Sequence, residues 1–405
     1  MRRTSAIICE FNPLHNGHVR LIRDAKDKGS DRVICIMSGN FVQRGEPAIA
    51  DKYTRAKAAI LAGADLVLEL PMPFSAASAE YFACAGVEIA ERLGCVDELV
   101  FGSENGDIKA LTEIAENQLS TDFINRFRRL YTGENGYAAS AQMAYEELFG
   151  KNDALSCPNN ILGIEYIKTL IRLKSNIAPR TIARENNYSD EELLGEFPSA
   201  TALRKLILSG EMEKTASQMP SSSYDMLLDA KENGLFPCDN EKYGFAVLSS
   251  MRLSDPASIA MCEGISGGLE NRIVQSALSC VAYTELLEKI ATKKYTDARL
   301  RRALLFSLLG VIPSDMALKP FYVNLLAAGD EGRELLSFVR KNAMIAVATK
   351  MADKKSVICG LDDIARADAS RLFDIEKKAE ALYTLCLPNI KEAGFFEKMI
   401  PFVEK

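Results

Sequence analysis

The segment CEFNPLHNGH, residues 9–18, holds both histidines of a chain of 405 residues. His15 and His18 stand three residues apart with Gly17 between them, where an apolar run gives way to a helical pattern. This spacing turns both imidazoles toward one side of a helix start, where unpaired backbone N–H groups favour anions. Gly17 lets a base or a phosphate approach the backbone closely. The segment therefore predicts a site that stabilises phosphate charge, such as an ATP site, with His15 and His18 as the catalytic pair.

A lone histidine is usually an ordinary core or surface residue, and this alternative applies to His15 and His18. We favour ligand binding because both histidines occur at one strand-to-helix corner around a glycine. The sequence contains no GxxxxGK(S/T) segment, and no GxGxxG segment follows the first expected strand. An HxGH-type site is therefore our prediction for nucleotide binding.

A second helix start offers groups that suit phosphate. In PSATALRKLI, residues 198–207, Ser199 reads as an N-cap, and the hydroxyl of Thr201 and the guanidinium of Arg204 are available to phosphate oxygens. FNPLHNGH resembles the HxGH motif of the nucleotidylyltransferase superfamily, whose members join a nucleotide's α-phosphate to an acceptor and release pyrophosphate. PSATALRKLI is similar to that superfamily's Ser-Ser-Thr-x-Ile-Arg segment for the leaving pyrophosphate, with Ala200 replacing the middle serine. Ser-x-Thr alone is most often just a cap, so the prediction depends on its pairing with HNGH.

Alternating strands and helices over the first hundred residues position these segments. We expect strands at 5–10, 31–39, 64–71 and 96–104, and helices at 17–29, 51–63 and 78–94. Strands that are apolar along their whole length, separated by helices, indicate a parallel sheet covered on both faces. The expected fold class is α/β, with a Rossmann-like nucleotidylyltransferase domain followed by a helix-rich C-terminal domain.

The carboxyl ends of the strands should form the ligand-binding edge of this sheet. That edge collects four segments that contain glycine, proline or asparagine: 9–18, 38–47, 71–75 and 102–105. Each is polar enough to line a ligand, as loops in this position commonly do.

The chain beyond residue 105 is mainly helical, apart from an extended piece at 178–184. A turn-rich interval follows at 217–225, and we place a domain boundary near it. We expect a catalytic, ATP-binding domain over 1–215 and a helix-rich domain over 216–405.

The composition is that of a soluble globular protein, with 48% hydrophobic and 26% charged residues. No segment reads as a signal peptide or a membrane span, so we expect a cytoplasmic protein without a membrane partner. The ten cysteines form no CxxC pair, which argues against disulfides and a zinc site. A net charge of −6 gives no global attraction to nucleic acid, so we expect no DNA partner, and RNA binding would need a local basic patch.

Several longer strings resemble one family, the bacterial tRNA(Met) cytidine acetate ligases. They are CEFNPLHNGH, MSGNFVQRGEPA (37–48), ADLVLELP (64–71), PNNILGIEYIK (158–168), PRTIARENNYSD (179–190), GLENRI (268–273) and TKKYTDARLRRALL (292–305). The resemblance implies an enzyme that activates acetate with ATP to acetyl-adenylate, without acetyl-CoA. It then transfers the acetyl group to N4 of the wobble cytidine of elongator tRNA(Met).

The same resemblance implies the residues that contact ATP. They are Ile7, Ile8, Cys9, Glu10, Phe11, Asn12, Pro13, Leu14, Asn16, Gly17, Val19, Arg20, Gly102, Asn159 or Asn160, and Arg184, beside Ser199, Thr201 and Arg204. Gly102 is expected at the ATP site even without the resemblance, because it lies near the end of a strand at the ligand-binding edge of the sheet. The asparagines could equally be turn formers after Pro158, and Arg184 could equally be a surface arginine. ATP chemistry usually recruits Mg²⁺ through the phosphates, so we expect that ion with ATP and no protein metal site.

The segment MSGNFVQRGEPA is polar and follows the second strand, so we expect a functional loop. Asn40, Gln43 and Arg44 are its candidate contacts to acetate, nucleotide or tRNA, although an ordinary ordered loop is the alternative.

A basic cluster near residue 300 is the candidate tRNA-binding surface, and it marks 216–405 as the expected tRNA-binding domain. It consists of Lys293, Lys294, Arg299, Arg301 and Arg302. A charged helix face is usually only solvated. The clustering in an acidic chain, together with the family resemblance, favours contact with an RNA backbone.

The chain departs from the expected family pattern at residues 188–190, where Tyr-Ser-Asp replaces Tyr-His-Asp. Two other functions stay open at this point. One is a nucleotidylyltransferase for a small phosphorylated acceptor, and the other is a non-catalytic RNA-binding protein with a nucleotide site. The intact histidine pair disfavours the second, and the long basic helical half disfavours the first.

Overall fold

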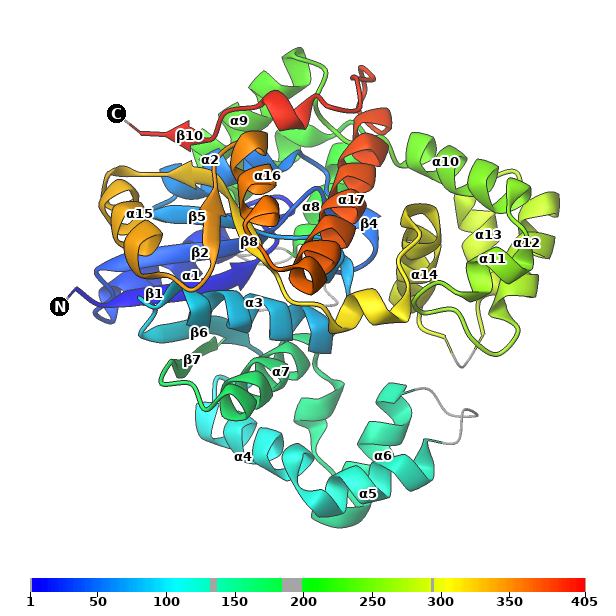
Figure 1. Ribbon diagram of the computed structural model, residues 1–405, viewed down its shortest axis with the longest axis horizontal. Helices are drawn as coiled ribbons and strands as arrows, with labels where there is room; N and C mark the ends of the chain where they lie inside the picture. The colour runs from blue at the N-terminus through cyan, green and yellow to red at the C-terminus, as the bar shows by residue number, and fades with distance from the viewer. Residues whose placement is uncertain (1, 132–136, 184–198, 293–294, 405) are drawn as a thin grey trace.

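The computed structural model describes residues 2–131, 137–183, 199–292 and 295–404, and a twisted sheet forms its centre (Figure 1). The strands of this sheet are β1 (Thr4–Cys9), β2 (Arg32–Ser38), β5 (Leu66–Leu70), β6 (Glu98–Ser103), β7 (Ala178–Ala183), β8 (Tyr322–Ala328), β9 (Ala346–Ala348) and β10 (Phe402–Val403). Their order is β10–β8–β5–β2–β1–β6–β7, and β9 pairs with β8. The neighbours from β5 to β7 all pair in parallel. The expected α/β sheet is confirmed, and each strand and helix expected over residues 1–104 is present.

Strands β1, β2 and β5 are buried along almost their whole length because helices cover both faces of the sheet. Ile8 and Ile36 pack with Phe82 of helix α3 (Ala79–Leu93), and helix α7 (Pro158–Leu173) lies on the same face. Ile7 and Cys35 face the other way, toward helices α1 (Asn16–Asp27) and α2 (Lys52–Leu61). Side chains alternate along a strand, so adjacent residues of β1 and β2 serve two separate cores.

Strand β8 comes from the half of the chain that the sequence analysis expected to be helix-rich. All seven of its residues are buried, and it pairs antiparallel with β5 at the side of the sheet away from β7. The second half of the chain therefore completes the central sheet as well as forming helices. We retain the division into 1–215 and 216–405 as a proposal about functional parts, since β8, β9 and β10 carry the sheet across it.

The remaining helices lie around this sheet. They are α4 (Ile108–Leu119), α5 (Thr121–Leu130), α6 (Tyr137–Phe149), α8 (Ala200–Leu208), α9 (Ser221–Glu232), α10 (Asn240–Leu253), α11 (Pro256–Ala260), α12 (Leu269–Ser279), α13 (Tyr283–Ile290), α14 (Asp297–Leu309), α15 (Asp330–Asn342), α16 (Met351–Cys359) and α17 (Asp363–Leu385). Helices α10–α14 form a lobe at the right of Figure 1, and α14 contacts the short hairpin of β3 (Phe41–Val42) and β4 (Glu46–Pro47).

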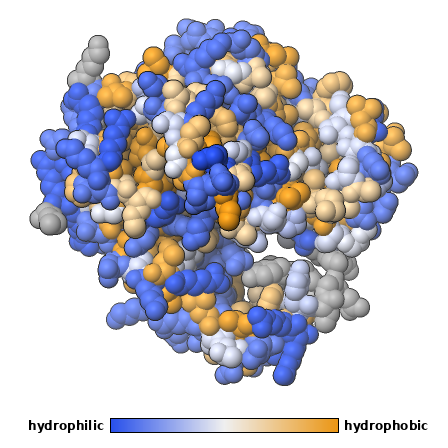
Figure 2. Space-filling view, in the orientation of Figure 1, coloured by the Kyte–Doolittle hydropathy of each residue, from blue (hydrophilic) through white to orange (hydrophobic). Residues whose placement is uncertain are grey.

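The surface in Figure 2 is mainly hydrophilic, and some apolar side chains lie at its right edge over the α10–α13 lobe. Exposed apolar residues of that lobe include Phe245, Leu253 and Val281. Among the described helices, none combines the length and the apolar character that a membrane crossing requires.

Candidate active site

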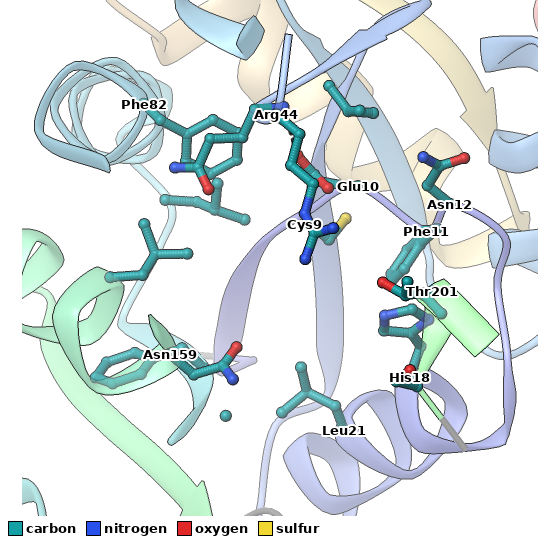
Figure 3. Close-up of a pocket in the computed structure, with 18 of the residues that line it drawn as sticks. Cys9, Glu10, Phe11, Asn12, His18, Leu21, Arg44, Phe82, Asn159 and Thr201 are labelled. Atoms are coloured by element: carbon teal, nitrogen blue, oxygen red, sulfur yellow. Dashed lines mark hydrogen bonds between the residues drawn. The ribbon is translucent and has the colours of Figure 1, made fainter. Parts of the chain in front are cut away.

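A pocket of about 180 Å³ opens at the carboxyl ends of β1 and β6. Figure 3 draws Cys9 and Glu10 at its centre, His18 and Thr201 on one side, and Phe82 and Asn159 on the other. These side chains come from α1 and α8 on the first side and from α3 and α7 on the second. The pocket therefore lies at the sheet edge that the strand directions predict for a ligand.

The two histidines cap the helix on which they stand. His15 is the N-cap of α1, where its Nδ1 accepts a hydrogen bond from the backbone N–H of Gly17 at 3.1 Å. Nδ1 of His18 accepts from the backbone N–H of His15 at 3.3 Å, and the two ring centroids lie 3.8 Å apart. A neutral imidazole that accepts at Nδ1 carries its proton on Nε2. Both rings line the pocket, so each can present an Nε2–H donor to a phosphate.

Helix α8 brings a second set of donors to the same pocket. Ser199 caps this helix, with its hydroxyl accepting from the backbone N–H of Ala202 at 3.2 Å. The guanidinium of Arg204 donates to the backbone oxygen of Asn12 at 2.8 Å and to the hydroxyl of Thr201 at 3.2 Å. The two helix starts picked out from the sequence, with N-caps His15 and Ser199 at 184 residues' separation, thus line one cavity. A polyanion at this point would meet two helix N-termini and one arginine.

Glu10 holds the loop after β2 against the end of β1. Its Oε1 accepts from the backbone N–H of Gln43 at 2.7 Å, and its backbone oxygen accepts from buried Arg55 at 2.5 Å. Burial raises the pKa of the Glu10 carboxyl, and the Gln43 hydrogen bond and the charges of Arg204, Arg55 and Arg44 oppose that rise. Glu10, Arg44 and Arg204 line the pocket and make it strongly polar, with buried Arg55 behind Glu10.

The asparagines after Pro158 form a clamp with Glu104 at the end of β6. Glu104 accepts from the side chain of Asn159 at 2.7 Å and from the backbone N–H of Asn160 at 2.8 Å. Asn160 is buried, and its side-chain oxygen accepts from the backbone N–H of Glu104 at 3.0 Å. Asn159 lines the pocket, and Asn160 does not, so Asn159 is the one placed for ligand contact.

The structure gathers many of the expected site residues on the pocket. Those that line it are Ile8, Cys9, Glu10, Phe11, Asn12, His15, His18, Gln43, Arg44, Gly102, Asn159, Ser199, Thr201 and Arg204. Those elsewhere in the described residues are Ile7, Pro13, Leu14, Asn16, Gly17, Val19, Arg20, Asn40 and Asn160. Ile7 and Leu14 belong to the core beneath the pocket, and Asn40 is buried against Glu380. Arg184 and the departure at 188–190 lie outside the described residues.

One wall of the pocket is apolar and was not predicted from the sequence. It comprises Leu21, Val42, Phe82, Phe101, Leu162 and Tyr166, and Glu46 also lines the pocket. Aromatic residues at helical spacing in α3 and α7 read as ordinary core, and most of each side chain is indeed buried. Only the position of Phe101 directly before Gly102, at the ligand edge, was a local signal.

Two basic residues of α14 contact residues 43–46, which lie at the turn of the β3–β4 hairpin and are called the pocket loop below. Arg301 pairs with Glu46 at 2.5 Å and with Asp297 at 2.6 Å, and Arg302 donates to the backbone oxygen of Gln43 at 3.2 Å. Arg299 lies over the ring of Tyr295, with 4.7 Å between its guanidinium carbon and the ring centroid. Lys293 and Lys294 lie outside the described residues. Tight internal contacts are therefore one role of this helix, and tRNA binding by its basic residues stays a prediction.

Comparison with known proteins identifies the relatives of this chain. The family model of the HIGH nucleotidyl transferases matches residues 2–396. Curated relatives named tRNA(Met) cytidine acetate ligase include a protein of Acetivibrio thermocellus, 38% identical over 96% of each chain, and one of Thermoanaerobacter sp., 33% identical over 96% of each chain. The crystal structure of Thermotoga maritima TmcAL bound with alpha-thio ATP is 30% identical, with a TM-score of 0.92 over 99% of each chain. The chain belongs to the HIGH nucleotidyl transferase family and, within it, to the tRNA(Met) cytidine acetate ligases.

Proposed function

We propose that this chain uses ATP to activate acetate as acetyl-adenylate and transfers the acetyl group to N4 of the wobble cytidine of elongator tRNA(Met). The observation that carries the proposal is the convergence of the HNGH corner and the Ser199–Arg204 helix start on one pocket. The similarity to a structure bound with alpha-thio ATP supports ATP as the ligand of that pocket. The names of the curated relatives support the acceptor.

In the first step a carboxylate oxygen of acetate attacks the α-phosphorus of ATP. The new P–O bond forms as the bond to the β-phosphate oxygen breaks, and pyrophosphate leaves with the bonding electron pair. The Nε2–H groups of His15 and His18 and the guanidinium of Arg204 oppose the negative charge that gathers on the phosphates. No side chain needs to form a covalent bond, so positioning and charge stabilisation account for the protein's part.

In the second step the exocyclic N4 of the cytidine attacks the carbonyl carbon of acetyl-adenylate. A C–N bond forms, the C–O bond to AMP breaks with its electron pair leaving on AMP, and the proton lost from N4 passes to water. Because AMP is a good leaving group, the protein's main task in this step is to bring a tRNA base to the pocket.

Mg²⁺ is expected to arrive with ATP. The described residues contain no group of three or more histidine, cysteine, aspartate or glutamate side chains able to hold a metal ion. Phosphate oxygens with water ligands are the usual partners of Mg²⁺ at such sites. The ion would supply charge neutralisation on the phosphates beside His15, His18 and Arg204.

The basic residues of the α14 region stay our proposal for part of the tRNA contact. Arg299 is the strongest of them, because it contacts Ser266 and the ring of Tyr295, both outside residues 43–46 at the pocket. A cytoplasmic location, where tRNA is present, is part of the same proposal.

Incubation of the purified protein with ATP, labelled acetate and unmodified tRNA tests this function. We expect label in the tRNA without acetyl-CoA, and acetate-dependent ATP–pyrophosphate exchange without tRNA. ATP turnover that ignores acetate would instead support a nucleotidylyltransferase for another acceptor, and ATP binding without turnover would support a non-catalytic nucleotide site.

A further inference from the structure

Two buried polar atoms on the pocket wall have no hydrogen-bond partner among the described residues. They are Nε2 of Gln43 and the hydroxyl oxygen of Tyr166, and both residues line the pocket. An unpaired buried polar group costs free energy, so such groups in a native structure commonly await a ligand or an ordered water. Nε2 of glutamine is a donor only, and the hydroxyl of tyrosine is a ready donor. The pair therefore suits a ligand with two acceptor atoms.

The backbone fixes Gln43 at this position from two sides. Its N–H donates to Glu10 at 2.7 Å, and its backbone oxygen accepts from Arg302 at 3.2 Å. Gly45, two residues further on, has φ +76° and lies so close to α14 that a Cβ there would approach the backbone N of Arg302 to 2.5 Å. The turn that carries Gln43 is thus set by contacts that do not involve its side-chain amide.

The fold fixes Tyr166 equally well. Its ring packs on Phe101, with 5.5 Å between the ring centroids, and only 2% of the residue is exposed. Gly163, one turn earlier on α7, lets this helix approach Phe101, since a Cβ there would lie 2.5 Å from the ring. Burial raises the pKa of the Tyr166 hydroxyl, and the neighbouring Cys9 and Glu10 raise it further, so the hydroxyl keeps its proton. Glu10 is therefore a common neighbour of Tyr166 and Gln43.

The wall near these donors is apolar and closely packed. Ile8, Phe82 and Phe101 line the pocket, and Phe101 packs directly on Tyr166; none of the three is more than 8% exposed. Gly86 of α3 meets Ile8 so closely that a Cβ there would lie 2.7 Å from its Cδ1. Figure 3 places Phe82 on the side of the pocket away from His18 and Thr201, with Arg44 between them near Glu10 and Cys9. Neutral donors beside apolar side chains suit a short carboxylate with a methyl group better than a polyphosphate, which the opposite side can serve.

We propose that Gln43 and Tyr166 form the acetate subsite, donating from Nε2 and the hydroxyl to the carboxylate while Ile8, Phe82 and Phe101 enclose the methyl group. This assignment rests on the proposed function. In this subsite one oxygen of the bound carboxylate is the atom that attacks the α-phosphorus of ATP. The wall sets the length of the acyl chain, so acetate enters and longer chains meet Phe82.

Two conservative substitutions test the subsite by acetate-dependent ATP–pyrophosphate exchange. Gln43→Leu and Tyr166→Phe each remove one donor and little volume, and each should raise KM for acetate about tenfold, as expected for a hydrogen bond to a charged group. The Kd for ATP, measured by calorimetry without acetate, should change less than about twofold. Tyr283→Phe is the matched control, because it removes an equally buried hydroxyl oxygen from the α13 region, outside the pocket.

Comparing the Kd for ATP with the KM for acetate distinguishes an acetate subsite from a nucleotide contact. A rise in the Kd for ATP as large as the rise in KM for acetate would assign both donors to the nucleotide and overturn the subsite. Unchanged kinetics in both variants of an active protein would also overturn it and leave the proposed function standing. A wild-type protein without acetate-dependent exchange would instead contradict the proposed function, and the acetate assignment with it.

The apolar wall has a test of its own. Phe82→Leu shortens the side chain that should limit the acyl chain, so the ratio of kcat/KM for propionate to that for acetate should rise about tenfold, within the range known for one methylene. An unchanged ratio in a variant with normal ATP affinity would contradict the role of Phe82.

Discussion

The guanidinium of Arg302 in helix α14 donates a hydrogen bond to the backbone oxygen of Gln43 in the pocket loop, across 3.2 Å. Burial and the nearby charge of Arg299 lower the pKa of Arg302 to about 10, and the side chain stays charged at neutral pH. A helix from the C-terminal half of the chain therefore holds a loop of the candidate active-site pocket. This contact joins the part expected to bind tRNA to the part expected to bind acetate.

Arg302→Met should slow acetate-dependent ATP–pyrophosphate exchange about tenfold, because the hairpin loses a charged hydrogen bond and Gln43 loses its fixed position. The measurement is exchange without tRNA, where a residue that only bound tRNA would have no effect. Arg333→Met, an exposed arginine on α15, is the control and should leave the exchange rate unchanged. A normal exchange rate in Arg302→Met together with weakened tRNA binding would contradict this prediction. It would mean that Arg302 contacts tRNA and does not position Gln43.

The sequence predicts the basic cluster that contains Arg302, but not the contact between Arg302 and Gln43. The charge cluster was visible in the sequence, but the direction of each side chain depends on how α14 packs against the hairpin, some 260 residues away in the chain. Strand β8 is similar, because its apolar run resembles the strands of the first half, yet its antiparallel pairing with β5 is a long-range contact. Local patterns were sufficient for β1, β2, β5 and β6, where apolar runs and glycine-terminated helices follow one another.

In the candidate site, too, residues with a local sequence pattern were predictable and residues placed only by long-range packing were not. The HNGH corner and the Ser199 helix start were recognisable because polar residues at helix starts have a local signature. Tyr166 and Phe82 had none, since a buried aromatic residue in an amphipathic helix reads as core whether or not a pocket lies beside it.

Substitution of His15 separates its two roles. Asparagine is a good N-cap, so His15→Asn should keep the bond to the Gly17 N–H and nearly the wild-type Tm, yet lower exchange by about a hundredfold through loss of the ring donor. His15→Ala loses the cap as well and should cost about a further 1 kcal/mol in stability. Thermal unfolding and exchange rates measured on both variants check this. Full activity in His15→Asn would mean that the ring serves only as a cap.

Gly45→Ala should destabilise the hairpin and the pocket together. The residue has φ +76°, and an added Cβ would meet the backbone N of Arg302 at 2.5 Å. We expect a loss of about 3 kcal/mol or more in unfolding free energy, combining left-handed strain with the clash. Gly150→Ala is the matched control, because its φ is +87° and nothing lies within 4 Å of its Cβ position, so only about 1–2 kcal/mol of strain applies. Urea unfolding measures both variants. Equal losses of unfolding free energy would show that α14 moves away to accommodate the added methyl group without cost.

A buried cluster behind the pocket loop should make stability depend on pH. Burial raises the pKa of Glu380 to about 7, with Glu69 and Glu376 adding to the rise and Lys52 opposing it. The folded chain then binds a proton that the unfolded chain releases near pH 4.5, so unfolding free energy should fall as pH rises from about 5 to about 7.

Unfolding by urea at several pH values measures this slope, and Glu380→Gln should reduce it. Glu113→Gln, an exposed glutamate on α4, should leave the slope as it is in the wild type. A slope of the opposite sign that Glu380→Gln abolishes would mean that Lys52 keeps Glu380 ionised, with its pKa lowered rather than raised.

The most direct test of the account is transfer of labelled acetate to tRNA by the purified protein. With ATP and unmodified elongator tRNA(Met), and without acetyl-CoA, we expect label at N4 of the wobble cytidine and release of AMP and pyrophosphate. Label in the tRNA only when acetyl-CoA is supplied, or ATP hydrolysis at the same rate with and without acetate, would contradict it.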